Sequence, residues 1–245
     1  MGKPKYSIVI PAYKEEKYIS KTLPELLNYL NQNHIFSGTE VIVVTADAPD
    51  KTDEIVESYS KKFNHFQHIR PGAKVGKGRD VKIGMRGARG DFIIFMDADG
   101  ATPLYHINDV FLRLEEGDEV VVGVRELHTI HTGYRKLTSL LAHKISWLLI
   151  DRHILDTQCG FKGFTALAGK EIFNRITVDG WAFDMEIITI ARQHSFRIMS
   201  YEIPDWQEKK STEDQLAGET GIIVYLKSFT EAVRIFGKKI TGAYK

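Results

Sequence analysis

Cysteine is almost absent from this sequence, and long uninterrupted runs of apolar residues are missing. Cys159 is the single cysteine among the 245 residues, which excludes an intrachain disulfide framework and a cysteine-rich zinc site and suits a reducing cytoplasm. No stretch approaches the roughly 18 apolar residues of a membrane-spanning helix, and no secretory signal opens the chain. We therefore expect a cytoplasmic protein whose membrane contact is peripheral, on the inner face of the membrane.

The sequence also lacks an excess of charge of either sign. It has 33 basic and 32 acidic residues, so it has no global field of the kind that recruits nucleic acid, and we expect no nucleic-acid partner. The length is ordinary for one α/β domain. We expect a catalytic domain over residues 1–210, followed over 211–245 by a mobile segment and an amphipathic helix.

Short apolar runs alternate with segments of helical periodicity along most of the chain. The runs predict strands at residues 6–11, 40–45, 66–70, 92–96, 119–124 and 197–204. Helices are predicted at 16–31, 52–63, 106–114, 134–150 and 222–237, with one more ending near Gly87 and one starting at Trp181. Alternation of this kind is typical of an α/β fold with a parallel sheet and right-handed crossovers.

The apolar run over residues 92–96 ends in Asp97, Ala98, Asp99 and Gly100. Such a run indicates a strand buried on both faces, and open α/β sheets bind ligands at the carboxyl ends of their strands. Two carboxylates there suit Mg²⁺ or Mn²⁺, which take further ligands from phosphate oxygens. An isolated Asp-x-Asp is more often a solvated acid pair or a helix N-cap. The buried strand before it and Gly100 after it favour the metal site.

A glycine- and lysine-rich loop over residues 71–79 includes Lys77. The loop lacks the Gly-x-x-x-x-Gly-Lys-Ser/Thr order of a P-loop, and on its own it is as often a plain basic surface. Its position just before the carboxylate strand favours contact with a diphosphate. Arg125 follows the 119–124 strand on the same side of the sheet as Asp97 and Asp99.

Two other features of the sequence do not point to a single role. The predicted helix over 134–150 either packs on the core or lies at a membrane interface, since cations flank its apolar residues. Asp184 is either a first-turn acid stabilised by the helix dipole or a catalytic acid. Cys159 has no histidine at a suitable spacing, so it is predicted to be a small buried side chain.

Four motifs occur in order along the chain. They are Ile10-Pro11-Ala12-Tyr13-Lys14-Glu15, Asp97-Ala98-Asp99-Gly100-Ala101-Thr102, Asp156-Thr157-Gln158-Cys159-Gly160-Phe161-Lys162 and Trp181-Ala182-Phe183-Asp184-Met185-Glu186. Together they resemble the family 2 inverting glycosyltransferases, most closely the dolichyl-phosphate β-glucosyltransferases and related polyprenyl-phosphate glycosyltransferases. The last two motifs are the more specific ones, and the resemblance covers residues 6–206.

The resemblance implies a GT-A fold, with a Rossmann-like nucleotide-binding half, a mixed central sheet and an acceptor half. It implies a nucleotide-sugar pocket lined by Pro11, Ala12, Tyr13, Glu15, Asp97, Ala98, Asp99, Gln158 and Trp181, with the metal on Asp97 and Asp99. The implied catalytic residues are Asp184, Arg125, which closes the motif Gly123-Val124-Arg125, and Arg135, which would meet the acceptor phosphate. Cations are needed there because an acceptor phosphate and a donor diphosphate repel each other.

Two departures from the family's usual pattern concern the nucleotide and a phosphate contact. After the second strand the family has Asp-Asp-Gly-Ser-x-Asp, whereas this chain has Thr45-Ala46-Asp47-Ala48-Pro49-Asp50. Asp47 could therefore replace the missing acids only after a shift along the chain, which leaves UDP or GDP open. The late Gly-Ser-Lys motif is replaced by Lys210-Ser211-Thr212, so Lys209 and Lys210 are the substitutes for its lysine.

The leading hypothesis is an enzyme that moves a hexose, with glucose favoured, from a UDP-glucose or GDP-mannose type donor to a polyprenyl (dolichyl-type) phosphate with inversion. One alternative is a family 2 transferase with a glycan or small soluble acceptor, favoured by the missing membrane-spanning segment. Another is a nucleotide-sugar-binding protein that has lost catalysis, suggested by Thr45 and Ala46 and opposed by the acids and Arg125. A sugar nucleotidyltransferase needs a glycine-rich loop after its first strand, and this chain has none there.

Overall fold

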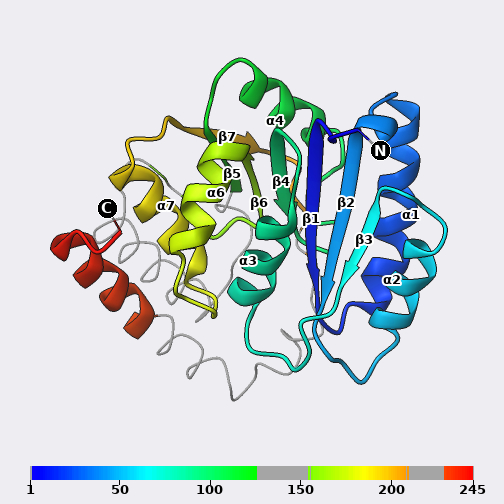
Figure 1. Ribbon diagram of the computed structural model, residues 1–245, viewed down its shortest axis with the longest axis horizontal. Helices are drawn as coiled ribbons and strands as arrows, with labels where there is room; N and C mark the ends of the chain where they lie inside the picture. The colour runs from blue at the N-terminus through cyan, green and yellow to red at the C-terminus, as the bar shows by residue number, and fades with distance from the viewer. Residues whose placement is uncertain (1, 126–153, 155, 208, 210–228, 245) are drawn as a thin grey trace.

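A computed structural model gives the fold (Figure 1), and it describes residues 2–125, 154, 156–207, 209 and 229–244. The first half consists of strand–helix units. The strands β1 (Tyr6–Ala12), β2 (Thr39–Thr45), β3 (Phe66–Ile69) and β4 (Phe92–Met96) alternate with α1 (Glu16–Gln32), η1 (Phe36–Gly38), α2 (Thr52–Ser60) and α3 (Lys77–Gly87). The four strands are parallel, in the order β3-β2-β1-β4, as the alternating sequence pattern predicts.

The second half makes the sheet mixed. Its elements are α4 (His106–Glu115), β5 (Val120–Arg125), β6 (Phe161–Thr165), α6 (Ala166–Arg175), α7 (Phe183–Gln193) and β7 (Ile198–Ile203). The sheet continues from β4 in the order β6-β5-β7, with β6 antiparallel to both of its neighbours and β7 parallel to β5. The patterns did not predict β6 and α6, because Lys162 and Gly163 interrupt the apolar run of β6.

The strands β1, β2 and β4 are buried on both faces, which explains why they are nearly continuous apolar runs, whereas the edge strands β3 and β7 are partly exposed. Along β1, Ile8 and Ile10 join one core with α1, α2 and α4. Val9 points to the other face and joins the core formed with α3, α6 and α7. The helices therefore cover the two faces in two layers (Figure 1), and the ends of the strands remain for a ligand site.

The C-terminal residues 229–241 are helical, so this helix continues past Gly237, where the sequence predicted its end. Ala232, Ile235 and Tyr244 are buried in the same core as α7. The rest of the predicted C-terminal helix, the predicted helix over 134–150 and the domain boundary after residue 210 fall outside the described residues. The division into two segments therefore stays a prediction.

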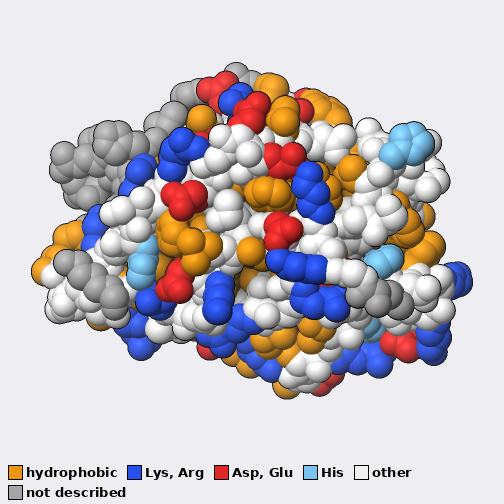
Figure 2. Space-filling model, turned by 45° about the horizontal axis from the view of Figure 1, so that its top comes forward, with side chains coloured by type: hydrophobic (Ala, Val, Ile, Leu, Met, Phe, Trp, Pro, Cys, Tyr) orange, Lys and Arg blue, Asp and Glu red, His pale blue; other side chains and the backbone are white. Residues whose placement is uncertain are grey.

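The surface carries charges of both signs. Figure 2 shows acidic and basic side chains interspersed over the face drawn, in keeping with the near-equal numbers of 33 and 32. Within the parts of the chain that the structure describes, no helix combines the length and the apolar character needed to cross a bilayer.

Candidate active site

The carboxyl ends of the central strands bring together charged residues that are far apart in the sequence. β1 and β4 are neighbours at the point where the strand order reverses, and open α/β sheets bind ligands in the crevice at such a point. Asp97 follows β4, and Arg125 ends β5. Lys77 begins α3 and Asp184 lies in the first turn of α7, so helix N-termini face the same region.

Lys77 forms the closest contact of the acid pair. Its Nζ lies 2.5 Å from Asp97 Oδ1 and 5.4 Å from the ring centroid of Trp181. Burial lowers the pKa of Lys77, but the negative charges of Asp97, Asp184 and Asp99 outweigh it and raise that pKa. The ammonium therefore stays charged, and a fixed cation beside a carboxylate pair suits the binding of a diphosphate.

Gly160 leaves room for the carboxylate of Asp97. The amide of Asp97 donates to the carbonyl oxygen of Gly160 at 3.0 Å, and a Cβ on Gly160 would lie 1.9 Å from Asp97 Oδ2. Any side chain at this position would displace the acid. The glycine of the motif over 156–162 thus has a steric role in placing the Asp-x-Asp motif.

Asp99 lies in the turn after Asp97, with buried Ala98 between them. Its Oδ1 accepts a hydrogen bond from the amide of Ala101 at 2.9 Å, and burial together with the negative charge of Asp97 raises the pKa of Asp99 to about 6. Mutually repelling carboxylates of this kind fit Mg²⁺ or Mn²⁺. The described residues contain no group of three or more His, Cys, Asp and Glu side chains suited to a metal. A cation here would therefore need further ligands from water or a bound phosphate group.

Asp184 is held by a second lysine, Lys162, which the sequence did not single out. The Nζ of Lys162 donates to Asp184 Oδ1 at 2.6 Å and to the carbonyl oxygen of Cys159 at 2.5 Å. Lys162 has no exposed surface and Asp184 is 3% exposed. Burial raises the pKa of Asp184, while the positive charges of Lys162 and Lys77 oppose this rise. A carboxylate with one oxygen bound to an ammonium is suited to holding a ligand in place.

Arg125 pairs with Asp156, the first residue of the motif over 156–162. Its Nε and Nη2 donate to Asp156 at 2.6 and 3.1 Å, and its guanidinium lies 5.1 Å from the ring centroid of Trp206. Gln158 is exposed, and its amide donates to the same carboxylate at 3.2 Å. Cys159 is fully buried, which raises the pKa of its thiol to about 12, so the prediction of a small buried side chain is confirmed.

The end of β1 carries the residues predicted to line the nucleotide pocket. Pro11 and Ala12 are the last residues of β1, and Tyr13 and Glu15 follow in the loop. The Nζ of Lys74 lies 4.6 Å from the ring centroid of Tyr13. The amide of Glu15 donates to Thr52 Oγ1 at the start of α2, at 2.8 Å. The loop is therefore tied to α2 on one side and to the basic loop on the other.

Beside this loop lies a polar cluster that the sequence analysis missed. The hydroxyl of Thr45 lies 2.7 Å from both Asp53 Oδ1 and His68 Nε2, and Arg70 binds Asp53 at 2.9 Å. Burial lowers the pKa of His68. Asp47, by contrast, is exposed, and its amide donates to the carbonyl oxygen of Gly72. No sequence signal marked the cluster, since its members come from β2, α2, β3 and the residue after β3.

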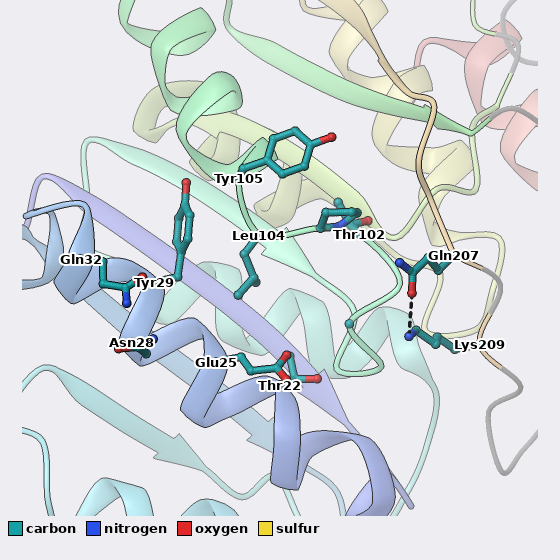
Figure 3. A pocket seen from close by; sticks show the side chains of 12 residues that line it. Thr22, Glu25, Asn28, Tyr29, Gln32, Thr102, Leu104, Tyr105, Gln207 and Lys209 are labelled. Atoms are coloured by element: carbon teal, nitrogen blue, oxygen red, sulfur yellow. Dashed lines mark hydrogen bonds between the residues drawn. The ribbon is translucent and has the colours of Figure 1, made fainter.

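A groove of about 530 Å³ adjoins the Asp99–Gly100 turn (Figure 3). α1 contributes Tyr29 and Glu25 to one side, and the segment after Gly100 contributes Leu104 and Tyr105 to the other. Lys209 also lines the groove, where its Nζ donates to Gln207 Oε1 at 3.0 Å. The predicted site residues Arg135 and Lys210 fall outside the described residues.

A parallel nucleotide-binding half, a mixed acceptor half and acids at the switch point are the features of a GT-A glycosyltransferase, and solved structures share this fold. Glucosyl-3-phosphoglycerate synthase from Mycobacterium tuberculosis, in complex with Mn²⁺, UDP-glucose and phosphoglyceric acid, matches with a TM-score of 0.70 at 14% identity, covering 96% of this chain and 80% of that one. Mannosyl-3-phosphoglycerate synthase from Rubrobacter xylanophilus matches with a TM-score of 0.66 at 15% identity, covering 94% and 76%. The predicted GT-A fold is thereby confirmed.

The chain belongs to glycosyl transferase family 2, whose model matches residues 7–176. A dolichyl-phosphate beta-glucosyltransferase from Trichomonas vaginalis is 32% identical, with 98% of this chain and 75% of that protein covered. The human dolichyl-phosphate beta-glucosyltransferase is 31% identical, with 82% of this chain and 67% of that protein covered. The predicted family and the glycosyltransferase class are thus confirmed.

Proposed function

We propose that this glycosyltransferase moves glucose from a nucleoside diphosphate sugar to a polyprenyl (dolichyl-type) phosphate, with inversion and with the help of Mg²⁺ or Mn²⁺. The observation that supports a dolichyl-type phosphate as acceptor is the similarity to dolichyl-phosphate beta-glucosyltransferases over 98% and 82% of this chain. The observation that supports the donor is Lys77 beside Asp97 and Asp99 at the switch point of the sheet. Both observations support the proposed reaction.

The donor would lie across the carboxyl ends of β1, β2 and β4. Pro11, Ala12, Tyr13, Glu15 and Asp47 are the proposed contacts of the nucleotide, and Lys77, Asp97, Ala98, Asp99, Gln158 and Trp181 those of the sugar diphosphate. A cation held by Asp97 and Asp99 would supply positive charge to the leaving diphosphate. Lys77 would add a second positive charge, and its ammonium lies near the ring of Trp181.

The acceptor phosphate would be drawn in by cations. Arg125 and Arg135 are its proposed contacts, and Lys209 and Lys210 are the proposed substitutes for the phosphate-contacting lysine of the nucleotide-sugar site. Arg125 is fixed in direction by Asp156 and Trp206, and Lys209 lines the groove next to Gly100 (Figure 3). Fixed cations reduce the repulsion between the acceptor phosphate and the donor diphosphate, which would otherwise keep the reactants apart.

Asp184 would orient the sugar or the acceptor. A phosphate acceptor has a second pKa near 6 by analogy with phosphorylated side chains, so at neutral pH it already carries an unprotonated oxygen and needs no general base. The contact of Lys162 with Asp184 Oδ1 at 2.6 Å supports such a fixed role. A hydroxyl acceptor would be different, because its proton must leave in the transition state.

The acceptor implies contact with a membrane surface, and the C-terminal helix supports it. Phe229, Val233 and Ile240 are 46%, 48% and 69% exposed, and their spacing places them on one stripe of the helix. Lys238 and Lys239 follow near its end. An exposed apolar stripe with neighbouring cations is the pattern of a helix that lies in a lipid headgroup layer. We propose peripheral binding to the cytoplasmic face of a membrane.

Incubation with a panel of UDP- and GDP-sugars and a short polyprenyl phosphate tests the proposal. The expected product is a glucosyl polyprenyl phosphate, detected by mass spectrometry, formed in the presence of Mg²⁺ or Mn²⁺ and lost in excess chelator. If sugar is transferred to a soluble glycan or alcohol and no glycolipid forms, the proposed acceptor is wrong and the acceptor is a soluble hydroxyl compound. Nucleotide-sugar binding without any transfer would instead support the catalytically lapsed alternative.

A further inference from the structure

The loop over residues 177–182 lies directly against the first turn of α3. A Cβ on Gly76 would lie 2.1 Å from the carbonyl oxygen of Asp179, and one on Gly78 would lie 2.7 Å from that of Val178. The backbones therefore touch with no room for side chains between them. The same turn of α3 carries Lys77, so a displacement of the loop would displace the lysine that contacts the acid pair.

Glu186 of α7 binds the start of the loop through hydrogen bonds. One oxygen of Glu186 accepts hydrogen bonds from the amides of Thr177 and Val178, both at 2.8 Å. The other oxygen accepts from Thr177 Oγ1 at 2.7 Å and from the hydroxyl of Tyr244 at 2.6 Å. Glu186 has no exposed surface and Tyr244 is 2% exposed. Tyr244 thus completes the partner set of a buried carboxylate whose other partners are all in the loop.

The end of the loop is held by the C-terminal helix. Glu231 Oε2 accepts a hydrogen bond from the amide of Ala182 at 3.3 Å. Its Oε1 lies 2.6 Å from the place that a Cβ on Gly180 would occupy, so the carboxylate sits directly against the backbone. Trp181 lies between these two contact points, and its ring meets the ammonium of Lys77.

We propose that Glu231 and Tyr244 are positioning residues for the donor diphosphate site. They act through the loop over 177–182, which sets the ring of Trp181 and the first turn of α3, and so sets Lys77 against Asp97. The inference rests on the proposed function, since it assigns the diphosphate to Lys77 and the acid pair. It extends that function by making residues 229–244 part of the apparatus that determines donor affinity.

Four variants test the proposal. Glu231→Ala removes the acceptor of the Ala182 amide, Glu231→Gln keeps an acceptor oxygen there, and Tyr244→Phe removes one hydrogen bond to Glu186. Glu171→Ala is the matched control, because its carboxylate pairs with Arg175 within the same helix, α6. Each is titrated calorimetrically with UDP and GDP at saturating Mn²⁺. A fluorine NMR spectrum of protein labelled with 5-fluorotryptophan, assigned by Trp181→Phe, reports the surroundings of Trp181 without any ligand.

Glu231→Ala and Tyr244→Phe are expected to weaken the tighter-bound nucleotide about tenfold, since small misplacements of binding groups are costly. The Trp181 signal should move in both. Glu231→Gln should restore affinity and signal, and Glu171→Ala should change neither. All measurements are made at a temperature at which the melting curves show more than 95% of each variant to be folded.

Unchanged nucleotide affinity with a shifted Trp181 signal would overturn the positioning role, and so would an unshifted signal in both variants. A parent protein that binds neither nucleotide would instead refute the proposed function. The fluorine signal would then decide alone whether the C-terminal residues set Trp181, because it is measured without ligand.

Discussion

The ammonium of Lys77 lies 2.5 Å from Asp97 Oδ1, so the lysine neutralises the same carboxylate that a divalent cation would use. A cation held by Asp97 and Asp99 would compete with Lys77 for Asp97 when no nucleotide is present. A bound diphosphate would change this balance, because its oxygens would bind both the cation and the ammonium. The ion pair therefore favours a site that binds metal weakly alone and more strongly with the donor.

Replacing Lys77 by Met tests this competition. We expect nucleoside diphosphate affinity at saturating Mn²⁺ to fall about 10- to 100-fold, since a charge-assisted hydrogen bond is lost. Mn²⁺ affinity without nucleotide should rise, because nothing then competes for Asp97. Calorimetric titration measures both. Lys61→Met, which removes an exposed lysine paired with Glu57 on α2, is the control, and an unchanged diphosphate affinity in Lys77→Met would contradict the assignment.

The raised pKa of Asp99 predicts how metal binding depends on pH. Its pKa is raised to about 6 by burial and by the charge of Asp97, and only the ionised form is a good metal ligand. Affinity for Mn²⁺ in the presence of nucleotide should therefore fall by about tenfold for each pH unit below 6.

Asp97→Asn and Asp99→Asn should each lower turnover by orders of magnitude. Full activity in the double variant would refute the metal site.

The raised pKa of Asp99 also predicts that the stability of the metal-free protein falls as pH rises, whereas its affinity for metal increases. A carboxyl group whose pKa is higher in the folded than in the unfolded chain binds its proton more tightly when folded, so stability falls as pH rises from about 3.8 to about 6. Asp99→Asn removes this loss. In excess chelator, the variant should melt at a higher temperature than the parent at pH 7.5, and the difference should shrink towards pH 4. The acid pair thus costs stability until a cation binds.

The sequence predicted the strands β1 and β4, because β4 is an uninterrupted apolar run and only Ser7 interrupts that of β1. It did not predict β6, where Lys162 is the second residue of the strand and has no exposed surface. A buried lysine requires an anionic partner, and that partner, Asp184, lies 22 residues further along the chain on α7. Local patterning cannot reveal such a pair.

The candidate site shows the same limit. The sequence placed Arg125 on the same side of the sheet as Asp97. The contacts of Lys77 with Asp97 and of Arg125 with Asp156, however, depend on how strands and helices are ordered in space. The Thr45 cluster depends on the pairing of β2 with β3. Burial and periodicity are local properties, whereas these contacts arise only once the sheet has formed.

The base-binding end of the donor pocket yields a prediction about Asp47. Its carboxylate is exposed at the end of β2, where the family's leading acids are replaced by Thr45 and Ala46. If Asp47 pairs with a base edge, Asp47→Ala should weaken the preferred nucleotide by about 1–3 kcal/mol, the cost of leaving that edge unpaired. Calorimetry with UDP and GDP measures it, with Asp91→Ala as the control for a lost surface charge. Equal affinities in the parent and Asp47→Ala would make Asp47 a surface residue only.

The exposed stripe of the C-terminal helix yields a prediction about lipid binding. Anionic vesicles should retain the parent better than neutral vesicles, by about 1 kcal/mol for each Lys or Arg near the surface. The double substitution of Val233 and Ile240 by Ser should weaken sedimentation with both. Leu112→Ser, which removes a side chain that is 55% exposed on α4, is the matched control. Equal recovery of the parent in the supernatant with neutral and anionic vesicles would favour a soluble acceptor.

The buried pair of Asp184 and Lys162 bears on both stability and catalysis. Asp184→Asn leaves the ammonium of Lys162 buried without its anion, and breaking one side of such a pair costs about 3–5 kcal/mol. Denaturant unfolding should show this loss, and the transfer assays must therefore be run well below the melting temperature of the variant. A smaller loss would indicate that water or a neighbouring group replaces the carboxylate.

The pH profile of transfer decides the role of Asp184. If the acceptor is a phosphate, kcat/KM should fall below about pH 6 with the ionisation of that phosphate. At saturating Mn²⁺, which holds Asp99 ionised, this acidic limb should survive in Asp184→Asn, with kcat/KM lowered by a similar factor at every pH. A positioned general base would behave differently, because its removal costs about 10²–10⁴ in rate and abolishes the limb that it causes. Burial raises the pKa of Asp184, so a limb that disappears with the carboxylate would identify it as the base and the acceptor as a hydroxyl.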